Sequence, residues 1–208
     1  MEIALACAVA VGALLFWERR GWTPGVWIAK LGASTLFLAA ALRWGALDSR
    51  YGRLVLAALA LCWLGDALLV PRRSPRLFLA GIGCFLLGHV AYAAAFLGHA
   101  TVSAAVALGG VAVGLGAWRL HAWLRPHLPG DFVLPVTAYL GVISAMLVAA
   151  LGNAAARGEV AVATGAVLFA VSDVSVARER FVSPGFENAA WGLPLYYAAQ
   201  LVLASSVR

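Results

Sequence analysis

Charged residues are scarce in this sequence. Asp, Glu, Lys and Arg together make up 12% of the 208 residues, whereas 63% are hydrophobic and the mean hydropathy is +0.92. Soluble domains carry roughly a quarter charged residues, so the shortage excludes a soluble globular fold and predicts an integral membrane protein. A spanning helix needs about 20 apolar residues, which leaves room for at most about eight or nine spans and no soluble domain.

Cysteine and histidine are also scarce. The three cysteines lie in apolar runs without paired spacing, which argues against a disulfide framework or a CxxC metal site. The four histidines, His89, His99, His121 and His127, form no convergent ligand set, so we expect neither a metal nor a cofactor. A Ser-His-Asp triad is not expected either, because no histidine falls level with Ser172 and an aspartate.

The amino terminus lacks the features of a secretory signal. In "MEIALACAVAVGALLFWERR" a glutamate stands where a signal peptide carries positive charge, and the arginines follow the apolar run. This order predicts a retained first membrane span.

Charge clusters and turn-forming residues divide the chain into eight apolar segments. They predict an all-α polytopic bundle of eight transmembrane helices that forms one domain over residues 1–208. Because eight is even, both termini are expected on one side of the membrane. The predicted spans are 3–17, 25–42, 53–70, 77–97, 102–118, 133–151, 160–177 and 188–205.

The positive charge consists of arginine, apart from Lys30 inside an apolar run. It lies between the segments, as topology signals and lipid-headgroup contacts do, so we expect no nucleic acid partner. Nine arginines fall at one face and five at the other, so the positive-inside rule makes the first face cytoplasmic and places both termini outside. The Arg-rich, Ala-rich composition suggests a bacterial inner membrane. The nine are Arg19, Arg20, Arg72, Arg73, Arg76, Arg119, Arg125, Arg178 and Arg180, and the five are Arg43, Arg50, Arg53, Arg157 and Arg208.

The two halves of the chain show a weak internal similarity. "LGDALLVPRRS" resembles "VSDVSVARERF", and His89 follows Asp66 by 23 residues, as Tyr196 follows Asp173. With four spans in each half, the pattern predicts two parallel four-helix repeats about an axis along the membrane normal.

Polar side chains interrupt several segments at a common depth. An ionisable group inside a span costs roughly 2.5–3.5 kcal/mol, so it normally faces the protein interior and has a partner or a function. At about 1.5 Å per residue, Asp66, Asp173 and Lys30 are expected about 7 Å below the cytoplasmic face. Tyr139 and Tyr196 follow at about 9 and about 12 Å. Five helices would therefore bring polar groups to one layer.

Structural roles are the alternative interpretation. Asp66 and Lys30 could form an ion pair kept for packing specificity, and Tyr196 and Tyr197 could be packing aromatics. His89 is expected at about 18 Å, too deep to contact Asp66. This depth is equally consistent with a histidine that only packs in the core.

Two level carboxylates could act as an acid and a base. Burial and mutual repulsion favour the protonated form of one, and a cation such as Lys30 favours the ionised form of the other. Such a pair suits hydrolysis of an acid-labile ether, in which protonation creates an oxocarbenium ion and the second carboxylate activates water. The sequence therefore predicts an enzyme that acts on a lipid linkage, with the order of Asp66 and Asp173 open. Supporting groups would be Lys30, Tyr139, Tyr196 and Ser172, and the lipid headgroup would lie near Arg72, Arg73, Arg76, Arg178 and Arg180.

A small transporter or lipid-binding protein is the rival hypothesis. Its aspartates would bind a cation or a proton, and polar residues would have to continue to the far face. On that route the sequence offers His89, Tyr92 and Gln200.

Five motifs occur in order along the chain: "WLGDALLV", "LAGIG" followed by "FLLGHVAYAAAF", "YLGVISAM", "GAVLFAVSDVSVARERF" and "LPLYYAAQLVL". Together they resemble the YhhN-like lysoplasmalogenase family of multi-pass membrane hydrolases, from the second segment to the last. The resemblance implies hydrolysis of the vinyl ether bond of lysoplasmalogens to a fatty aldehyde and a glycerophospho-base, with a lysophospholipid substrate and membrane lipids as partners. The family's polar positions carry over to Lys30, Asp66, His89, Tyr92, Tyr139, Ser172, Asp173, Tyr197 and Gln200.

Overall fold

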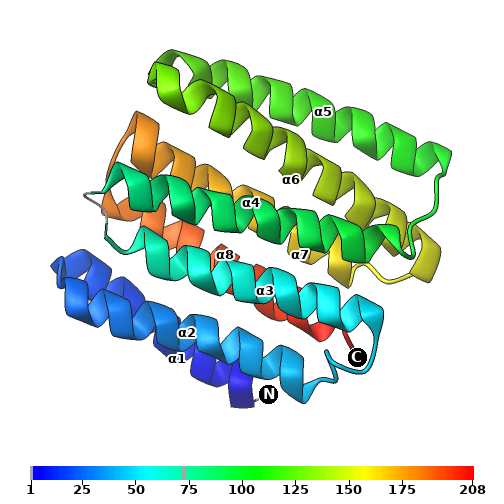
Figure 1. The fold of residues 1–208 in the computed structure, drawn as a ribbon, viewed down its shortest axis with the longest axis horizontal. Helices are drawn as coiled ribbons and strands as arrows, with labels where there is room; N and C mark the ends of the chain where they lie inside the picture. Colours follow the sequence, from blue (N-terminus) through cyan, green and yellow to red (C-terminus); the bar gives the residue numbers. More distant parts are fainter. Residues whose placement is uncertain (1, 72–73) are drawn as a thin grey trace.

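Eight α-helices contain most of the part of the chain that the structure describes. A computed structural model describes residues 2–71 and 74–208, and every regular element in that part is helical, which confirms the all-α prediction. Successive helices run in opposite directions, and both termini lie at the same end of the bundle (Figure 1). The helices are α1 (Glu2–Arg20), α2 (Thr23–Arg43), α3 (Arg50–Leu69), α4 (Pro75–Leu97), α5 (Ala104–Leu124), α6 (Gly130–Arg157), α7 (Ala161–Ala177) and α8 (Phe186–Ser205).

The eight apolar segments coincide with these helices, and the longest extensions past the expected ends occur at α5, α6 and α7. The helix α5 continues to Leu124, and α6 begins earlier and ends later than the segment 133–151. The end of α6 is fixed by Gly158, which takes a left-handed conformation with φ +69° that favours glycine. The helix α7 continues as a π-helical turn, Arg178–Val182, so Asp173 lies farther from this helix end than its sequence position suggested.

Six helices of the described chain are long and apolar enough to cross a membrane. They are α2, α3, α4, α6, α5 together with the 3-10 turn Arg125–His127, and α7 together with its π-helical turn. The other two, α1 and α8, pack alongside them: α1 contacts α2 and α8, and α8 contacts α7. The helices therefore indicate a membrane protein with six candidate spans.

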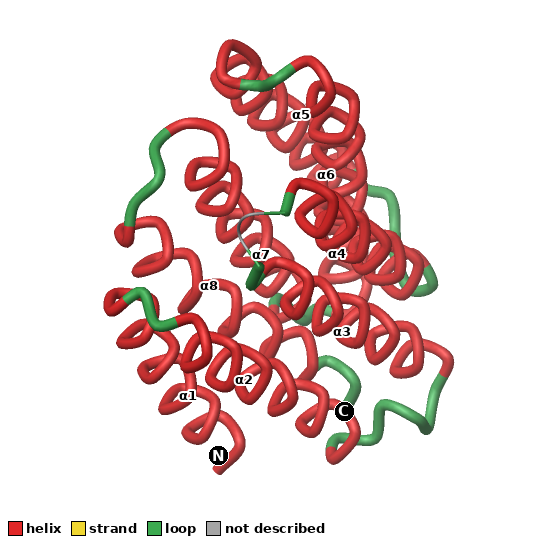
Figure 2. The backbone as a smooth tube through the Cα atoms, turned by 60° about the vertical axis from the view of Figure 1, so that its left-hand side comes forward, coloured by secondary structure: helices red, strands yellow, loops and turns green. Residues whose placement is uncertain are grey.

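The helices form two rows that face each other (Figures 1 and 2). One row contains α2, α3 and α4, and the other contains α1, α8 and α7. At one end of the rows, α6 packs against both α4 and α7, and α5 lies outside α6. Because α5 packs mainly on α6, most of its residues stay exposed, and only Val106 and Leu124 are buried.

Glycines let α3 and α4 approach each other closely, as small residues do between membrane helices. A methyl group added at Gly65 of α3 would meet the ring of Phe85 in α4 at 2.6 Å. One added at Gly88 of α4 would meet the sulfur of Cys62 at 3.1 Å and the carbonyl oxygen of Ala58 at 3.3 Å. This contact fixes the position of Asp66, the residue that follows Gly65.

The variant Gly65→Val is expected to destabilise the fold by about 1–3 kcal/mol, because overpacking forces the buried Phe85 ring to move. The matched control is Gly83→Val on α4, where an added methyl group has open space. The measurement is thermal unfolding in detergent, followed by tryptophan fluorescence. Equal midpoints for the two variants would show that the α3–α4 contact is less tight than its geometry indicates.

Candidate active site

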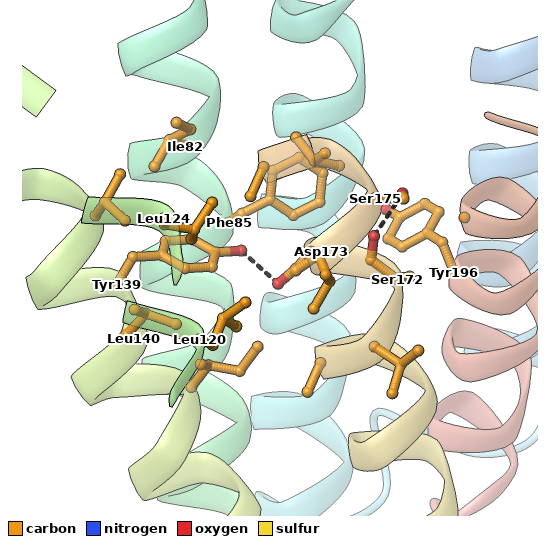
Figure 3. A pocket seen from close by; sticks show the side chains of 18 of the residues that line it. Ile82, Phe85, Leu120, Leu124, Tyr139, Leu140, Ser172, Asp173, Ser175 and Tyr196 are labelled. Atoms are coloured by element: carbon orange, nitrogen blue, oxygen red, sulfur yellow. Dashed lines mark hydrogen bonds between the residues drawn. The ribbon is translucent and has the colours of Figure 1, made fainter. Parts of the chain in front are cut away.

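A cavity of about 380 Å³ lies between the helices. Its walls are mostly apolar, with Ile82, Phe85 and Leu140 among the side chains that point into it (Figure 3). The lining residues Gly116 of α5 and Val171 of α7 are exposed, so the cavity reaches the surface of the bundle between these two helices. Both predicted carboxylates, Asp66 and Asp173, lie in the wall of this cavity.

Asp66 is almost completely buried and faces three donors. One carboxylate oxygen lies 3.3 Å from Nζ of Lys30 in α2. The other accepts hydrogen bonds from the hydroxyl groups of Ser34 in α2 and Tyr196 in α8, each at 2.7 Å. A cation and two hydroxyl donors stabilise the ionised form of this carboxylate.

Ser34 was not among the site residues predicted from the sequence. It follows Lys30 by four residues, so both side chains lie on the same face of α2, and this spacing was the signal that could have identified it. The hydroxyl of Tyr197 lies 3.1 Å from the Ser34 hydroxyl and donates to the carbonyl oxygen of Lys30 at 3.1 Å. Tyr197 therefore supports the Lys30 and Ser34 turn rather than Asp66 directly.

Asp173 has a different set of partners. The hydroxyl of Tyr139 in α6 donates to its Oδ2 at 2.8 Å, and the two side chains point toward each other in the cavity (Figure 3). Nε2 of His89 in α4 lies 3.3 Å from the same oxygen. Asp173 is 17% exposed, compared with 2% for Asp66, so it is the more accessible of the two carboxylates.

The position of His89 differs from the sequence expectation. From its distance to the helix end, His89 was expected to lie about 11 Å deeper than Asp173. In the structure, Nε2 of His89 lies only 3.3 Å from Oδ2 of Asp173. The main reason is the extension of α7 to Val182, because five added residues place Asp173 about 7 Å deeper at most. A histidine therefore does lie level with an aspartate beside Ser172, although the Ser172 hydroxyl donates to the carbonyl oxygen of Phe169 at 2.7 Å.

Aromatic rings connect the two carboxylate clusters. The ring of Phe169 in α7 lies 5.5 Å from that of Tyr196 and 4.4 Å from that of His89, centroid to centroid. Phe85 lies 5.9 Å from Tyr196 and lines the cavity. These phenylalanines were not predicted, because a phenylalanine in an apolar helix resembles any other core residue.

Tyr92 and Gln200 lie outside the candidate site. The Tyr92 hydroxyl donates to the side-chain oxygen of Gln200 at 2.7 Å, both residues are buried, and neither lines the cavity. Within the described residues, the polar lining of this cavity therefore does not continue to Tyr92 and Gln200, as a transport route to the far face would require.

The predicted headgroup arginines have different environments. Arg178 pairs with Asn188 and lies 3.6 Å from a carboxylate oxygen of Glu187. The guanidinium of Arg180 lies 4.4 Å from the centroid of the Phe78 ring, which lines the cavity. Arg76 is exposed, and Arg72 and Arg73 lie outside the described residues.

This arrangement places two carboxylates with different partners on one apolar cavity. Asp66 faces a cation and two hydroxyl groups, whereas Asp173 faces one hydroxyl group and a histidine. A pair of titratable groups in unlike environments provides an acid and a base. The cavity can therefore offer acid and base chemistry to an apolar molecule that enters between α5 and α7.

Comparisons with known proteins give a consistent result. The model of the YhhN family matches residues 25–207. The chain is 35% identical over 153 residues to lysoplasmalogenase TMEM86A of Bos taurus, which covers 69% of this chain and 60% of the relative. It is 34% identical over 163 residues to a lysoplasmalogenase of Mycobacterium tuberculosis, which covers 76% of this chain and 60% of the relative.

A third relative is human lysoplasmalogenase TMEM86B, 31% identical over 156 residues, with 75% of this chain and 64% of the relative covered. The matched part of the chain thus spans less than two thirds of the length of these relatives. No solved structure gives a significant match.

Proposed function

The chain belongs to the YhhN family, and from this premise we propose that it is a membrane-embedded lysoplasmalogenase. It would hydrolyse the vinyl ether bond of a lysoplasmalogen to a fatty aldehyde and a glycerophospho-base, with Asp66 and Asp173 as acid and base. The observation that carries the proposal is the presence of both carboxylates on one apolar cavity. The names of the three relatives support the same reaction.

The reaction needs one proton donor and one proton acceptor. Protonation of the outer alkene carbon converts the vinyl ether to an oxocarbenium ion. Water then adds to the carbon next to the ether oxygen and gives up a proton, which forms a hemiacetal. The hemiacetal collapses to the aldehyde and the free glycerol hydroxyl group. A carboxylic acid and a carboxylate can supply every proton transfer in this sequence.

The cavity suggests how the substrate would lie. The alkenyl chain would occupy the apolar space between α5 and α7, and the vinyl ether would reach the two carboxylates. Arg180 is the arginine best placed for the phosphate, because it lies over Phe78 in the cavity wall. Arg178 is less available, since Asn188 and Glu187 already contact its guanidinium.

The variant Gly116→Leu should obstruct this chain site. Gly116 lines the cavity and has open space around it, so a leucine side chain can enter the cavity without a backbone clash. Each methylene excluded from an apolar site costs about 0.8 kcal/mol, so KM for a long-chain substrate should rise about tenfold for every two methylenes displaced. Kinetics with substrates of different chain length measure this effect.

The matched control is Gly114→Leu, on the same helix, also in open space and outside the cavity lining. Its KM values should equal those of the wild type. An equal rise in both variants, or no dependence on chain length, would contradict the placement of the chain between α5 and α7.

We further propose that all eight helices cross the bacterial inner membrane. The arginine-rich connections lie at the end of the bundle opposite the two termini, which supports a cytoplasmic arginine-rich face and termini outside. Asp66 and Asp173 belong to helices that end at this face, so the active-site layer would lie near the cytoplasm.

The contacts of the two aspartates support two four-helix repeats. Asp66 is contacted by Tyr196, the residue 23 positions after Asp173, and Asp173 is contacted by His89, the residue 23 positions after Asp66. The packing is also equivalent: α2 packs against α3 and α8, as α6 packs against α7 and α4. We propose that a pseudo-two-fold axis passes between the two carboxylates.

An assay with paired substrates tests the function. Purified protein in detergent should release aldehyde from a lysoplasmalogen, and should not cleave the saturated ether analogue of the same chain length and headgroup. The saturated ether lacks the alkene carbon that accepts the proton. Cleavage of both substrates would contradict the mechanism, and cleavage of neither would contradict the proposed function.

A further inference from the structure

His89 is a buried histidine whose two ring nitrogens face different groups. Its side chain is 1% exposed, and Nδ1 lies 2.7 Å from the carbonyl oxygen of Phe85. A carbonyl oxygen only accepts hydrogen bonds, so Nδ1 carries a hydrogen and donates it to Phe85. In a neutral ring this arrangement leaves Nε2 with a lone pair and no hydrogen.

That lone pair would face an oxygen of Asp173. Nε2 lies 3.3 Å from Oδ2 of Asp173, and it has no hydrogen-bond partner elsewhere among the described residues. An unprotonated nitrogen opposite a carboxylate oxygen would place two acceptors against each other in an apolar site. One proton between Nε2 and Oδ2 removes this conflict, either on the ring or on the carboxyl group.

Asp66 does not need such a proton. Lys30 supplies a cation to one of its oxygens, and the hydroxyl groups of Ser34 and Tyr196 donate to the other. Among the described residues, Asp173 has no comparable cation apart from His89, because Tyr139 of α6 donates only a neutral hydroxyl group. A proton is therefore required between Asp173 and His89, but not between Asp66 and its partners.

We propose that His89 and Asp173 hold one proton between them, and that this pair is the acid of the reaction while Asp66 is the base. The assignment rests on the proposed function for its catalytic part. Asp173 is the catalytic residue that faces the substrate, and His89 is a positioning residue that keeps the proton at Oδ2 and stabilises the carboxylate after transfer. The more exposed position of Asp173 agrees with this role.

The proton transfers balance over one turnover. The shared proton moves to the outer alkene carbon, which leaves Asp173 ionised beside His89. Water loses a proton to Asp66 as it adds to the oxocarbenium carbon. The proton on Asp66 then passes to the ether oxygen, the carbon–oxygen bond breaks, and the hemiacetal hydroxyl proton returns to the His89–Asp173 pair. Both carboxylates end in their starting states.

Nitrogen NMR of histidine-labelled protein in detergent tests the shared proton without any substrate. The variant His89→Gln identifies the His89 signals among the four histidines. In the wild type at neutral pH, Nε2 of His89 should either carry a proton or accept a strong hydrogen bond from the protonated carboxyl group of Asp173. In Asp173→Leu this signature should be lost, and in Tyr139→Phe, which keeps the carboxylate, it should remain.

A wild-type His89 with a hydrogen on Nδ1 only and a free Nε2 would overturn the proposal, even if Asp173→Leu does not fold. Because this measurement needs no catalysis, it is independent of the proposed function. If aldehyde release is absent while the NMR signature is present, the function fails and the proton pair stands.

Kinetics test the catalytic part. Proton transfer by a positioned group contributes roughly 10²–10⁴-fold, so His89→Gln should lower kcat by about 100-fold or more while KM changes less than about threefold. Glutamine can still donate to Asp173 but cannot share a proton with it. An unchanged kcat, or an effect confined to KM, would overturn the role of His89.

Discussion

Aldehyde release should fall by about 10³-fold or more when Asp66 is replaced with asparagine, because an amide does not accept the proton that water loses as it attacks. The substitution also leaves the Lys30 cation without its carboxylate partner, which lies 3.3 Å away in the wild type. Removal of one partner of a buried ion pair costs about 3–5 kcal/mol. Asp66→Asn should therefore lose both activity and stability.

A double variant separates these two effects. Lys30→Met combined with Asp66→Asn removes the unpaired cation, so it should recover folded yield and thermal stability without recovering activity. Asp48→Asn, at an exposed aspartate that does not line the cavity, should behave as the wild type. Substantial aldehyde release by the double variant would exclude Asp66 as the base.

Asp173→Asn should lose activity to a similar extent, by about 10³-fold or more, because asparagine has no proton to give to the alkene carbon. Its effect on stability should be small, less than about 1 kcal/mol, because the amide can hydrogen-bond with both Tyr139 and His89 and leaves no cation unpaired. Initial rates of aldehyde release and thermal unfolding of the same preparations give both quantities.

The contrast between the two variants is the informative result. Both should be inactive, but only Asp66→Asn should be markedly less stable. Equal destabilisation would indicate that Asp173 is as dependent on a cation as Asp66 is. Retained activity in Asp173→Asn would remove this residue from the mechanism.

The sequence predicted the helices and one polar layer, because both follow from local features. Long apolar segments separated by charge define membrane helices, and residue counts from the helix ends define depth. Asp66, Lys30 and Tyr196 were predicted at similar depths on three helices, and the structure brings them into contact. Tyr139 and Asp173 also meet as this reasoning suggests.

Contacts that depend on rotation and on exact helix ends could not be predicted. The extension of α7 to Val182 places Asp173 at the level of His89, whereas the charged residues in "RERFV" predicted that the span ends before this segment. The approach of Phe169 to both Tyr196 and His89 depends on which faces of three helices meet. A uniformly apolar helix carries little periodicity from which to read such faces.

The fate of the water oxygen tests the central claim most directly. Purified protein is incubated with a lysoplasmalogen in water labelled with a heavy oxygen isotope, and the masses of both products are measured. If water adds to the oxocarbenium carbon, fatty aldehyde is released and the glycerophospho-base keeps its original, unlabelled oxygen. Label in the glycerophospho-base, or no aldehyde at all, would contradict carboxylate-catalysed hydrolysis of the vinyl ether by this protein.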